Sequence, residues 1–240
     1  MTAERPSRAA DAVIARWAAT LTVQAGPRRR AAREHAVAEL RAAISEGVLP
    51  PGAEIPEQAA AEALGTSRNT LREAFRVLFH DGLLEHRDHR GVIVRRLRAE
   101  DIVDIYNARI LLECGALEAA HRAPSERVDL IRQAAAAGLA ALPGRDPQEL
   151  RRCGMAFHLS VVALARSRLV SAFADTLFTQ LQLAYHQTRD PAEFHASFIE
   201  RNVVIADRLG EGEFGEAADA MRQYLRDAQA QLLTSIAMPH

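Results

Sequence analysis

Signals for β-strands are confined to one short stretch of this chain, and all that follows it has a helical pattern. Two apolar runs, LLEH and VIVRR, flank the turn-forming segment RDHRG and predict a β-hairpin within residues 83–96. After Leu97 the periodicity is helical to the end of the chain, and it is interrupted only at proline and glycine residues. The chain is thereby restricted to a small hairpin-containing domain followed by a helical one.

The helical part predicts six helices joined by short loops, which is typical of a helix bundle. Each break contains residues that end helices, such as Pro124, Pro143 with Gly144, and Pro191. The predicted helices cover residues 100–121, 126–141, 147–166, 168–188, 193–210 and 213–236.

Three more helices are predicted before the hairpin. A helical pattern beginning at Ala31 ends at Gly47, and the sequence LPPG then predicts a tight turn. A short helix, EQAAAEALG, is followed by the helix SRNTLREAFRVLFHDG, which Thr66 or Ser67 caps and Gly82 ends. Three helices and a hairpin in this order outline a winged helix-turn-helix.

The predicted fold is therefore mainly α, with an N-terminal winged helix-turn-helix and a C-terminal all-α six-helix bundle. The predicted boundaries are 31–98 for the first domain and 99–240 for the second. Residues 1–30 form an N-terminal extension with an apolar patch around Ile14 and Trp17. We expect this extension to be disordered or loosely helical.

Lysine is absent from the chain, and every one of its 30 basic side chains is arginine. This excludes pyridoxal-phosphate chemistry through a lysine Schiff base and a phosphate loop of the Walker type. The two cysteines, Cys114 and Cys153, are too few and too isolated for a disulfide framework or a CxxC site. No signal-peptide core or membrane-length apolar run is found, so we expect a cytoplasmic protein without membrane contact.

Charge is distributed unevenly between the two parts. Residues 1–98 hold 16 arginines against 12 acidic residues, a net charge of +4, whereas residues 99–240 have 14 against 19, or −5. The first part is therefore the one suited to approach a polyanion.

The helix SRNTLREAFRVLF has the pattern of a DNA-reading element. Leu71, Phe75 (or Ala74) and Leu78 form one apolar stripe, while the arginines fall largely on the other face. An arginine there suits the O6 and N7 atoms of guanine, and hydroxyls at the helix start suit phosphates. Taken alone, the segment also fits an ordinary surface helix with a solvated arginine face.

The wider segment, residues 36–96, closely resembles the DNA-binding domain of the GntR family. It contains the "PG" turn, the pattern G-x-SR-x-x-[VL]-REA, L-x-x-DGL and a glycine-containing wing, in that order. The resemblance implies that DNA contacts come from the recognition helix and from the wing tip: Ser67, Arg68, Asn69, Thr70, Arg72, Arg90 and Gly91. Family members often carry an arginine where this chain has Gln58, and the wing RDHRG is slightly longer than usual.

Residues 100–232 resemble the FCD, or FadR/VanR-like, effector domain of GntR regulators. The fragments IYNARILLECGALEAA, FHLSVVALARS and AADAMRQYL match its signatures, and six helices favour the VanR-like subgroup. The lack of lysine excludes the aminotransferase-like version of the family. The resemblance implies a homodimer that binds a pseudo-palindromic double-stranded operator and senses a small molecule.

One polar residue on each of four predicted helices falls among apolar neighbours. These four residues, Arg109, His158, Asn202 and Tyr224, are our predicted effector-binding set. Glu113 lies one turn after Arg109 and can pair with it. Buried polar groups need partners, so the set is either an effector pocket or an internal hydrogen-bond network. In the first case Arg109 is the anchor for a carboxylate, with the other three as supporting donors.

Many FCD domains hold a divalent metal through an aspartate and three histidines. At those positions this chain has Gly154, His158, Asn202 and Tyr224, which is a poor ligand set for a transition metal. We therefore predict no metal and no cofactor, although His186 and His195 are nearby alternatives as ligands.

Together these features predict a DNA-binding transcription regulator, a repressor that responds to a small organic acid or related metabolite. One alternative is a metal-modulated or ligand-independent regulator with a vestigial pocket. Another is an enzyme that uses the helical domain, but the sequence shows no nucleophile–base pair, phosphate loop or metal quartet. We expect no enzymatic activity.

Overall fold

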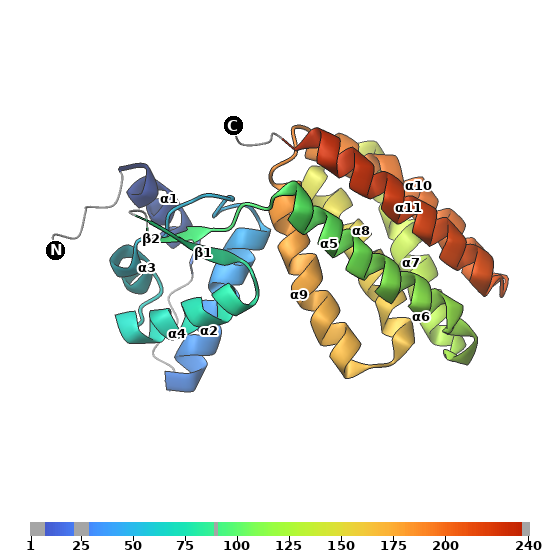
Figure 1. Ribbon diagram of the computed structural model, residues 1–240, viewed down its shortest axis with the longest axis horizontal. Coiled ribbons are helices and arrows are strands. Elements are labelled where there is room, and N and C mark those ends of the chain that lie inside the picture. Colours follow the sequence, from blue (N-terminus) through green and yellow to red (C-terminus); the bar gives the residue numbers. More distant parts are fainter. Residues whose placement is uncertain (1–7, 22–28, 89–90, 237–240) are drawn as a thin grey trace. The chain divides into compact units, whose positions relative to one another are not determined.

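The computed structural model describes residues 8–21, 29–88 and 91–236. The chain divides into two compact units, Met1–Leu97 and Arg98–His240, called here the N-terminal and the C-terminal unit (Figure 1). No helix in the described ranges has both the length and the apolar character needed to cross a bilayer.

The N-terminal unit is a winged helix-turn-helix, as predicted. Its elements are α1 (Arg8–Ala18), α2 (Arg29–Ser45), α3 (Glu57–Ala63), α4 (Arg68–His80), β1 (Leu84–Arg87) and β2 (Gly91–Val94). The two strands pair antiparallel, with Glu85 opposite Ile93. Its core contains fully buried side chains from α2, α4 and the hairpin, among them Leu40, Ile44, Leu71, Leu78 and Ile93.

The described part of the N-terminal extension contains a packed helix, whereas the sequence predicts a disordered or loosely helical segment. Residues 8–18 form the helix α1, which contacts α3. The apolar patch seen in the sequence is the reason, because Ile14 and Trp17 are only 2% and 1% exposed. Burial of two such large side chains stabilises a helix that would be marginal alone. Residues 22–28, which include part of the arginine run, lie outside the described residues.

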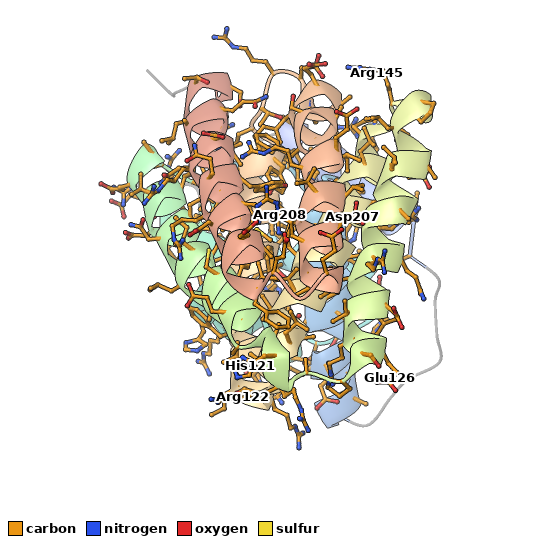
Figure 2. All side chains as sticks on the ribbon, turned by 90° about the vertical axis from the view of Figure 1, so that its right-hand side faces the viewer. His121, Arg122, Glu126, Arg145, Asp207 and Arg208 are labelled. Carbon is orange, nitrogen blue, oxygen red and sulfur yellow. The ribbon has the colours of Figure 1, made fainter. Side chains whose placement is uncertain are left out.

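The C-terminal unit is the predicted bundle. Five of its helices are α7 (Ser125–Ala141), α8 (Pro147–Val162), α9 (Arg168–Tyr185), α10 (Pro191–Gly210) and α11 (Phe214–Ser235). The helix α10 packs against α7, α8 and α11, whereas α9 packs against α8 (Figure 1). Charged side chains such as Arg145, Asp207 and Arg208 lie on its outer surface (Figure 2).

The first predicted helix of this unit is interrupted in the middle. It begins as α5 (Ala99–Arg109), continues as a π-helical turn at Ile110–Cys114, and ends as α6 (Gly115–Glu118). A π turn inserts one extra residue into the helical hydrogen-bond ladder and often lies at a functional site. Here it begins directly after Arg109 and contains Glu113, the two residues that the sequence pairs.

Candidate functional site

The start of α4 is built as a capped helix. Ser67 is the N-cap, and its Oγ accepts a hydrogen bond from the backbone N–H of Thr70 at 3.1 Å. The two hydroxyls of Ser67 and Thr70 are also 2.9 Å apart. Either hydroxyl can be the donor in this contact; Ser67 is exposed, whereas Thr70 is 5% exposed.

The two faces of α4 are arranged as the sequence predicts. Leu71, Phe75 and Leu78 are buried, and the polar residues Arg68, Asn69 and Arg72 are exposed. An amphipathic helix of this kind presents its polar face outward while the apolar stripe fixes it to the domain.

Two arginines of α4 are held by side chains of α3. Arg72 donates from Nε to Oε2 of Glu57 at 2.9 Å. Arg68 donates from Nη2 to Oε1 of Gln58, also at 2.9 Å. Gln58 in turn donates from Nε2 to Glu62 at 3.1 Å. Gln58, which stands where the family resemblance leads one to expect an arginine, thus supports the first arginine of the recognition helix.

The wing supplies the remaining predicted contacts. Gly91 is the first residue of β2 and has a φ of +69°, a conformation that glycine adopts without strain. Arg90, the other predicted wing residue, lies outside the described residues.

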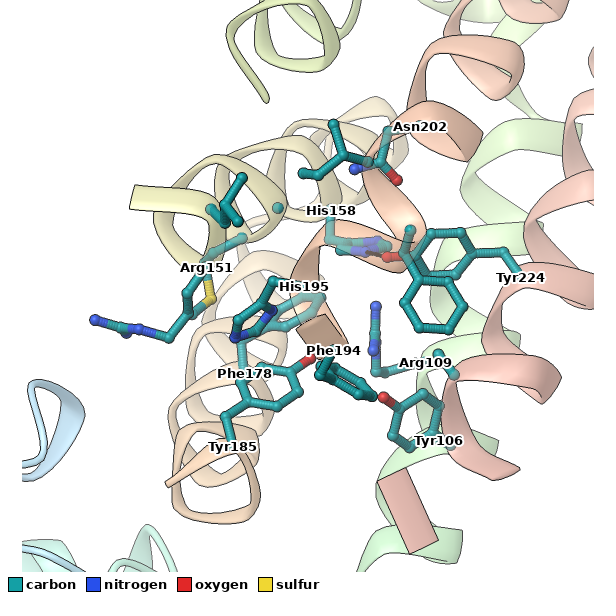
Figure 3. Close-up of a pocket in the computed structure, with 16 residues that line it drawn as sticks. Tyr106, Arg109, Arg151, His158, Phe178, Tyr185, Phe194, His195, Asn202 and Tyr224 are labelled. Carbon is teal, nitrogen blue, oxygen red and sulfur yellow. Dashed lines mark hydrogen bonds between the residues drawn. The ribbon is translucent and has the colours of Figure 1, made fainter. Parts of the chain in front are cut away.

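All four predicted effector residues line one cavity in the C-terminal unit (Figure 3). Arg109 comes from α5, His158 from α8, Asn202 from α10 and Tyr224 from α11. The cavity has a volume of about 20 Å³, enough for one water molecule. An organic ligand therefore has to displace side chains that line the cavity in order to enter.

A chain of hydrogen bonds connects three of these residues through Glu113. Arg109 donates from Nε to Oε1 of Glu113 at 2.8 Å, and Oε2 of Glu113 is 2.6 Å from Nδ1 of His158. Nε2 of His158 is 3.0 Å from the Tyr224 hydroxyl. Arg109 and Glu113 are 1% and 0% exposed, so this ion pair is fully buried. The predicted pairing of Arg109 with Glu113 is confirmed.

The protonation states of Glu113 and His158 determine which atoms donate in these hydrogen bonds. Burial favours the protonated form of Glu113, but the adjacent Arg109 and His158 lower its pKa, so the carboxylate is ionised. Burial lowers the pKa of His158, and Glu113 offsets this only in part. A neutral His158 must then donate from Nδ1 to Glu113 and accept at Nε2 from Tyr224. Both nitrogens of His158 are therefore occupied.

Four buried polar atoms around the cavity have no partner of hydrogen-bond geometry among the described residues, although the Tyr185 hydroxyl lies near enough to Tyr106 and Arg109 to interact with both. They are the Tyr106 hydroxyl, Nη2 of Arg109, Nε2 of His195 and Oδ1 of Asn202. All four residues line the cavity. An unpaired buried polar group costs about 1–3 kcal/mol, and four at one place are unusual for an internal network that serves stability alone.

Several residues of the cavity are absent from the predicted set. Tyr106 belongs to the apolar stripe of its helix in the sequence, yet its hydroxyl faces the cavity beside Arg109 (Figure 3). Tyr185 and His195 lie at the end of α9 and near the start of α10. Burial, together with Arg151 and His186, lowers the pKa of His195 to about 3. Tyr106 is overlooked because its ring counts as apolar in the stripe, whereas Tyr185 and His195 lie near helix ends, where periodicity does not assign a face; His195 is considered in the sequence only as an alternative metal ligand.

The residues at the family's metal positions do not fit a metal ion. Gly154 has no side-chain ligand, His158 uses both nitrogens, and the Tyr224 hydroxyl donates to His158. Within the described ranges, no three His, Cys, Asp or Glu side chains are grouped as metal ligands require. The predicted lack of a metal remains a prediction.

Comparison with known proteins agrees with the architecture. Residues 32–94 match the bacterial regulatory proteins of the gntR family, and residues 104–227 match the FCD domain. Over 181 residues the chain is 34% identical to the Probable D-xylose utilization operon transcriptional repressor of Paenarthrobacter nicotinovorans, covering 73% of this chain and 78% of that protein.

Two further relatives extend this comparison. An HTH-type transcriptional regulator of Agrobacterium vitis is 35% identical over 170 residues, covering 67% of this chain and 98% of that protein. The crystal structure of a GntR transcriptional regulator from Rhodococcus sp. RHA1 superimposes with a TM-score of 0.79 at 30% identity, covering 86% of this chain and 100% of that one. The chain belongs to the gntR family of DNA-binding transcription regulators, and its C-terminal unit is an FCD domain.

Proposed function

We propose that this regulator is a repressor whose DNA binding responds to a small organic acid held in the cavity of the C-terminal unit. Arg109 anchors the acid, with Asn202, Tyr106 and His195 as further contacts. His158, which the sequence suggests as a direct donor, and Glu113 instead hold Arg109 and Tyr224 in place.

The observation that carries this proposal is the set of four unpaired buried polar atoms. Nη2 of Arg109 is a charged donor without an acceptor, although Nε of the same guanidinium is bonded to Glu113. A carboxylate oxygen is the acceptor that such a group prefers. The guanidinium also lies 4.9 Å and 5.1 Å from the ring centroids of Tyr106 and Phe178, which fix its position.

We further propose that the protein acts as a homodimer on a pseudo-palindromic operator. Seven large hydrophobic residues are exposed among the described residues, and all seven lie in the C-terminal unit. Leu169 and Phe173, one turn apart on α9, are 84% and 54% exposed. Exposed apolar side chains of this size support an interface in this unit. Two copies place two recognition helices on two half-sites.

A thermal-shift screen of chelator-treated protein tests the effector. The compounds are small carboxylates, sugar acids, acyl-coenzyme A thioesters and zinc. A ligand at about 100 times its dissociation constant adds about 2.7 kcal/mol, which raises the melting temperature visibly. We expect stabilisation by an acid and none by zinc. Stabilisation by zinc alone would identify a metal-modulated regulator, and no stabilisation at all would identify a ligand-independent one.

The Tyr106→Phe variant tests the site. It removes an unpaired hydroxyl, so the apo protein keeps its stability while the affinity for the acid falls about five- to tenfold. An unchanged affinity in this variant and in Asn202→Leu would contradict the assigned site. Release of a DNA fragment on addition of the acid, measured by fluorescence anisotropy, tests the repressor role.

A further inference from the structure

The C-terminal unit has a second cavity, which shares no lining residue with the effector cavity. It is an open groove of about 480 Å³ beside the connection from α8 to α9, at the lower end of the bundle in Figure 1. Three arginines line it: Arg127 near the start of α7, Arg166 in the connection, and Arg168 at the first position of α9. A volume of this size is ordinary for a small-molecule site.

The charge of these three arginines is not neutralised by the described part of the protein. Within the described ranges none of the three forms an ion pair. Arg127 donates from Nη1 to the backbone carbonyl of Ala163 at 3.1 Å, which fixes its guanidinium but leaves its charge unpaired. Residues 99–240 as a whole are acidic, with 14 arginines against 19 acidic residues. A cluster of unpaired cations in an acidic unit indicates a site for an anion.

Arg166 is best understood by comparison with Arg145. Both residues follow a short 3₁₀ turn and have a left-handed backbone, with φ of +52° and +49° respectively. Glycine adopts this conformation without strain, whereas a residue with a side chain does so at a cost in free energy. The side chain of Arg145 forms an ion pair with Glu193, but Arg166 has no such partner in the part of the chain that the structure describes. The fold itself therefore gives no reason for an arginine at position 166.

Hydroxyl and carboxylate groups continue the groove along α9. Ser167 caps this helix by accepting a hydrogen bond from the N–H of Val170 at 3.3 Å, and its hydroxyl can still donate. Ser171 and Asp175 follow Arg168 at one-turn intervals on the same face, and both line the groove. Asp175 lies two turns from Arg168, or roughly 10 Å along the helix axis. The groove thus has a cationic end and, two turns away, an acceptor suited to ligand hydroxyls.

We propose that this groove binds a sugar monophosphate as a second ligand of the protein. The phosphate lies among Arg127, Arg166 and Arg168, because planar guanidinium groups bind phosphate oxygens in pairs. The sugar hydroxyls lie toward Ser171 and Asp175. A second phosphate at that end would be repelled by the carboxylate of Asp175. This inference does not depend on the proposed organic-acid effector, because the two cavities have no residue in common.

Isothermal titration calorimetry on the full-length protein, in a buffer without phosphate, tests this proposal. The probe is glucose 6-phosphate, and glucose, inorganic phosphate and fructose 1,6-bisphosphate are titrated at the same ionic strength. We expect glucose 6-phosphate to bind with a dissociation constant below about 1 mM, and inorganic phosphate and the bisphosphate to bind about tenfold more weakly. Glucose, which has no charge for the arginines, should not bind.

Arg166→Gly and Arg145→Gly are the matched variants, because each replaces a left-handed arginine by glycine and relieves the same backbone strain. We expect Arg166→Gly to weaken binding of glucose 6-phosphate about tenfold and Arg145→Gly to change it by less than about twofold. Asp175→Asn should weaken binding of glucose 6-phosphate but not of inorganic phosphate. Asn202→Leu, in the effector cavity, should leave both affinities unchanged.

Several results would overturn the proposal. One is a wild-type protein that does not bind glucose 6-phosphate at up to about 10 mM, or binds it no more tightly than inorganic phosphate. Another is an equal loss in Arg166→Gly and Arg145→Gly, or a loss in Asn202→Leu, which would place the probe elsewhere. The last is weaker binding of a labelled duplex DNA of random sequence by Arg166→Gly but not by Arg145→Gly. The groove would then contact a nucleic-acid backbone instead.

Discussion

Arg72 and Arg109 are both paired with a glutamate, but they lie in opposite environments. The side chain of Arg72, in the N-terminal unit, is 61% exposed, and that of Arg109, in the C-terminal unit, is 1% exposed. The bond from Nε to the carboxylate is 2.9 Å in the first pair and 2.8 Å in the second. The two ion pairs thus have nearly the same geometry but differ in their exposure to solvent.

The two ion pairs differ in their contribution to stability because only the exposed pair is solvated. An exposed pair is solvated in either state and contributes about 0–1 kcal/mol, so its arginine can gain a DNA contact at little cost. A buried pair has lost its hydration, and removal of one partner leaves the other charge uncompensated at a cost of about 3–5 kcal/mol. The first pair is suited to orienting an arginine for an external partner, and the second to keeping a cavity charged and fixed.

The largest expected effect comes from breaking the buried pair. Arg109→Met should lower the free energy of unfolding by about 3–5 kcal/mol, because Glu113 is left ionised without its main partner. The matched change Arg72→Met should alter it by less than about 0.5 kcal/mol. Urea denaturation followed by circular dichroism measures both, and equal effects would show that burial does not distinguish the two pairs.

A smaller effect is expected from pH, through a buried histidine of the C-terminal unit. The pKa of His195 is about 3 in the folded protein, against about 6.5 in an unfolded chain. As the pH falls below 6.5 the unfolded chain binds the proton first, so stability falls by about 1.4 kcal/mol per pH unit. Between pH 6.5 and 5.0 the wild type should lose about 2 kcal/mol more than His195→Phe. Parallel pH profiles of the two proteins would contradict this.

The smallest effect compares two tyrosines of the cavity. Tyr224→Phe removes the donor to Nε2 of His158 and should lower stability by about 1–2 kcal/mol, since that nitrogen is left unpaired. Tyr106→Phe removes a hydroxyl that makes no hydrogen bond of good geometry, although it lies near the Tyr185 hydroxyl, and should change stability by less than about 0.5 kcal/mol. Chemical denaturation at neutral pH distinguishes the two, and a larger loss for Tyr106→Phe would mean that its hydroxyl is part of the structural network.

Local signals account for most of what the sequence predicts correctly. The cap at Ser67, the apolar stripe of α4 and the breaks between helices depend on neighbouring residues, and each lies at or close to its predicted place. The pairing of Arg109 with Glu113 also follows from a separation of four residues on one helix. The family resemblance adds the functional class, which composition and periodicity do not provide.

The features that the sequence does not predict depend on long-range packing. Glu113 is bonded to Nδ1 of His158, 45 residues away, and Tyr224 is bonded to Nε2, so neither nitrogen is left for the effector as the prediction supposes. The π turn at Ile110–Cys114 has no composition that separates it from an α-helix. The helix α1 packs against α3, and this contact exists only once the N-terminal unit has folded.

Trp17, buried in α1, is the single tryptophan of the chain. The intrinsic tryptophan emission of the protein therefore originates entirely in the N-terminal unit, while the proposed effector cavity lies in the other. Trp17 is thus an intrinsic fluorescent probe of the DNA-binding unit, whereas the proposed effector binds in the other unit. A change in this emission when an acid binds would report that binding in one unit is transmitted to the other, without any dye attached.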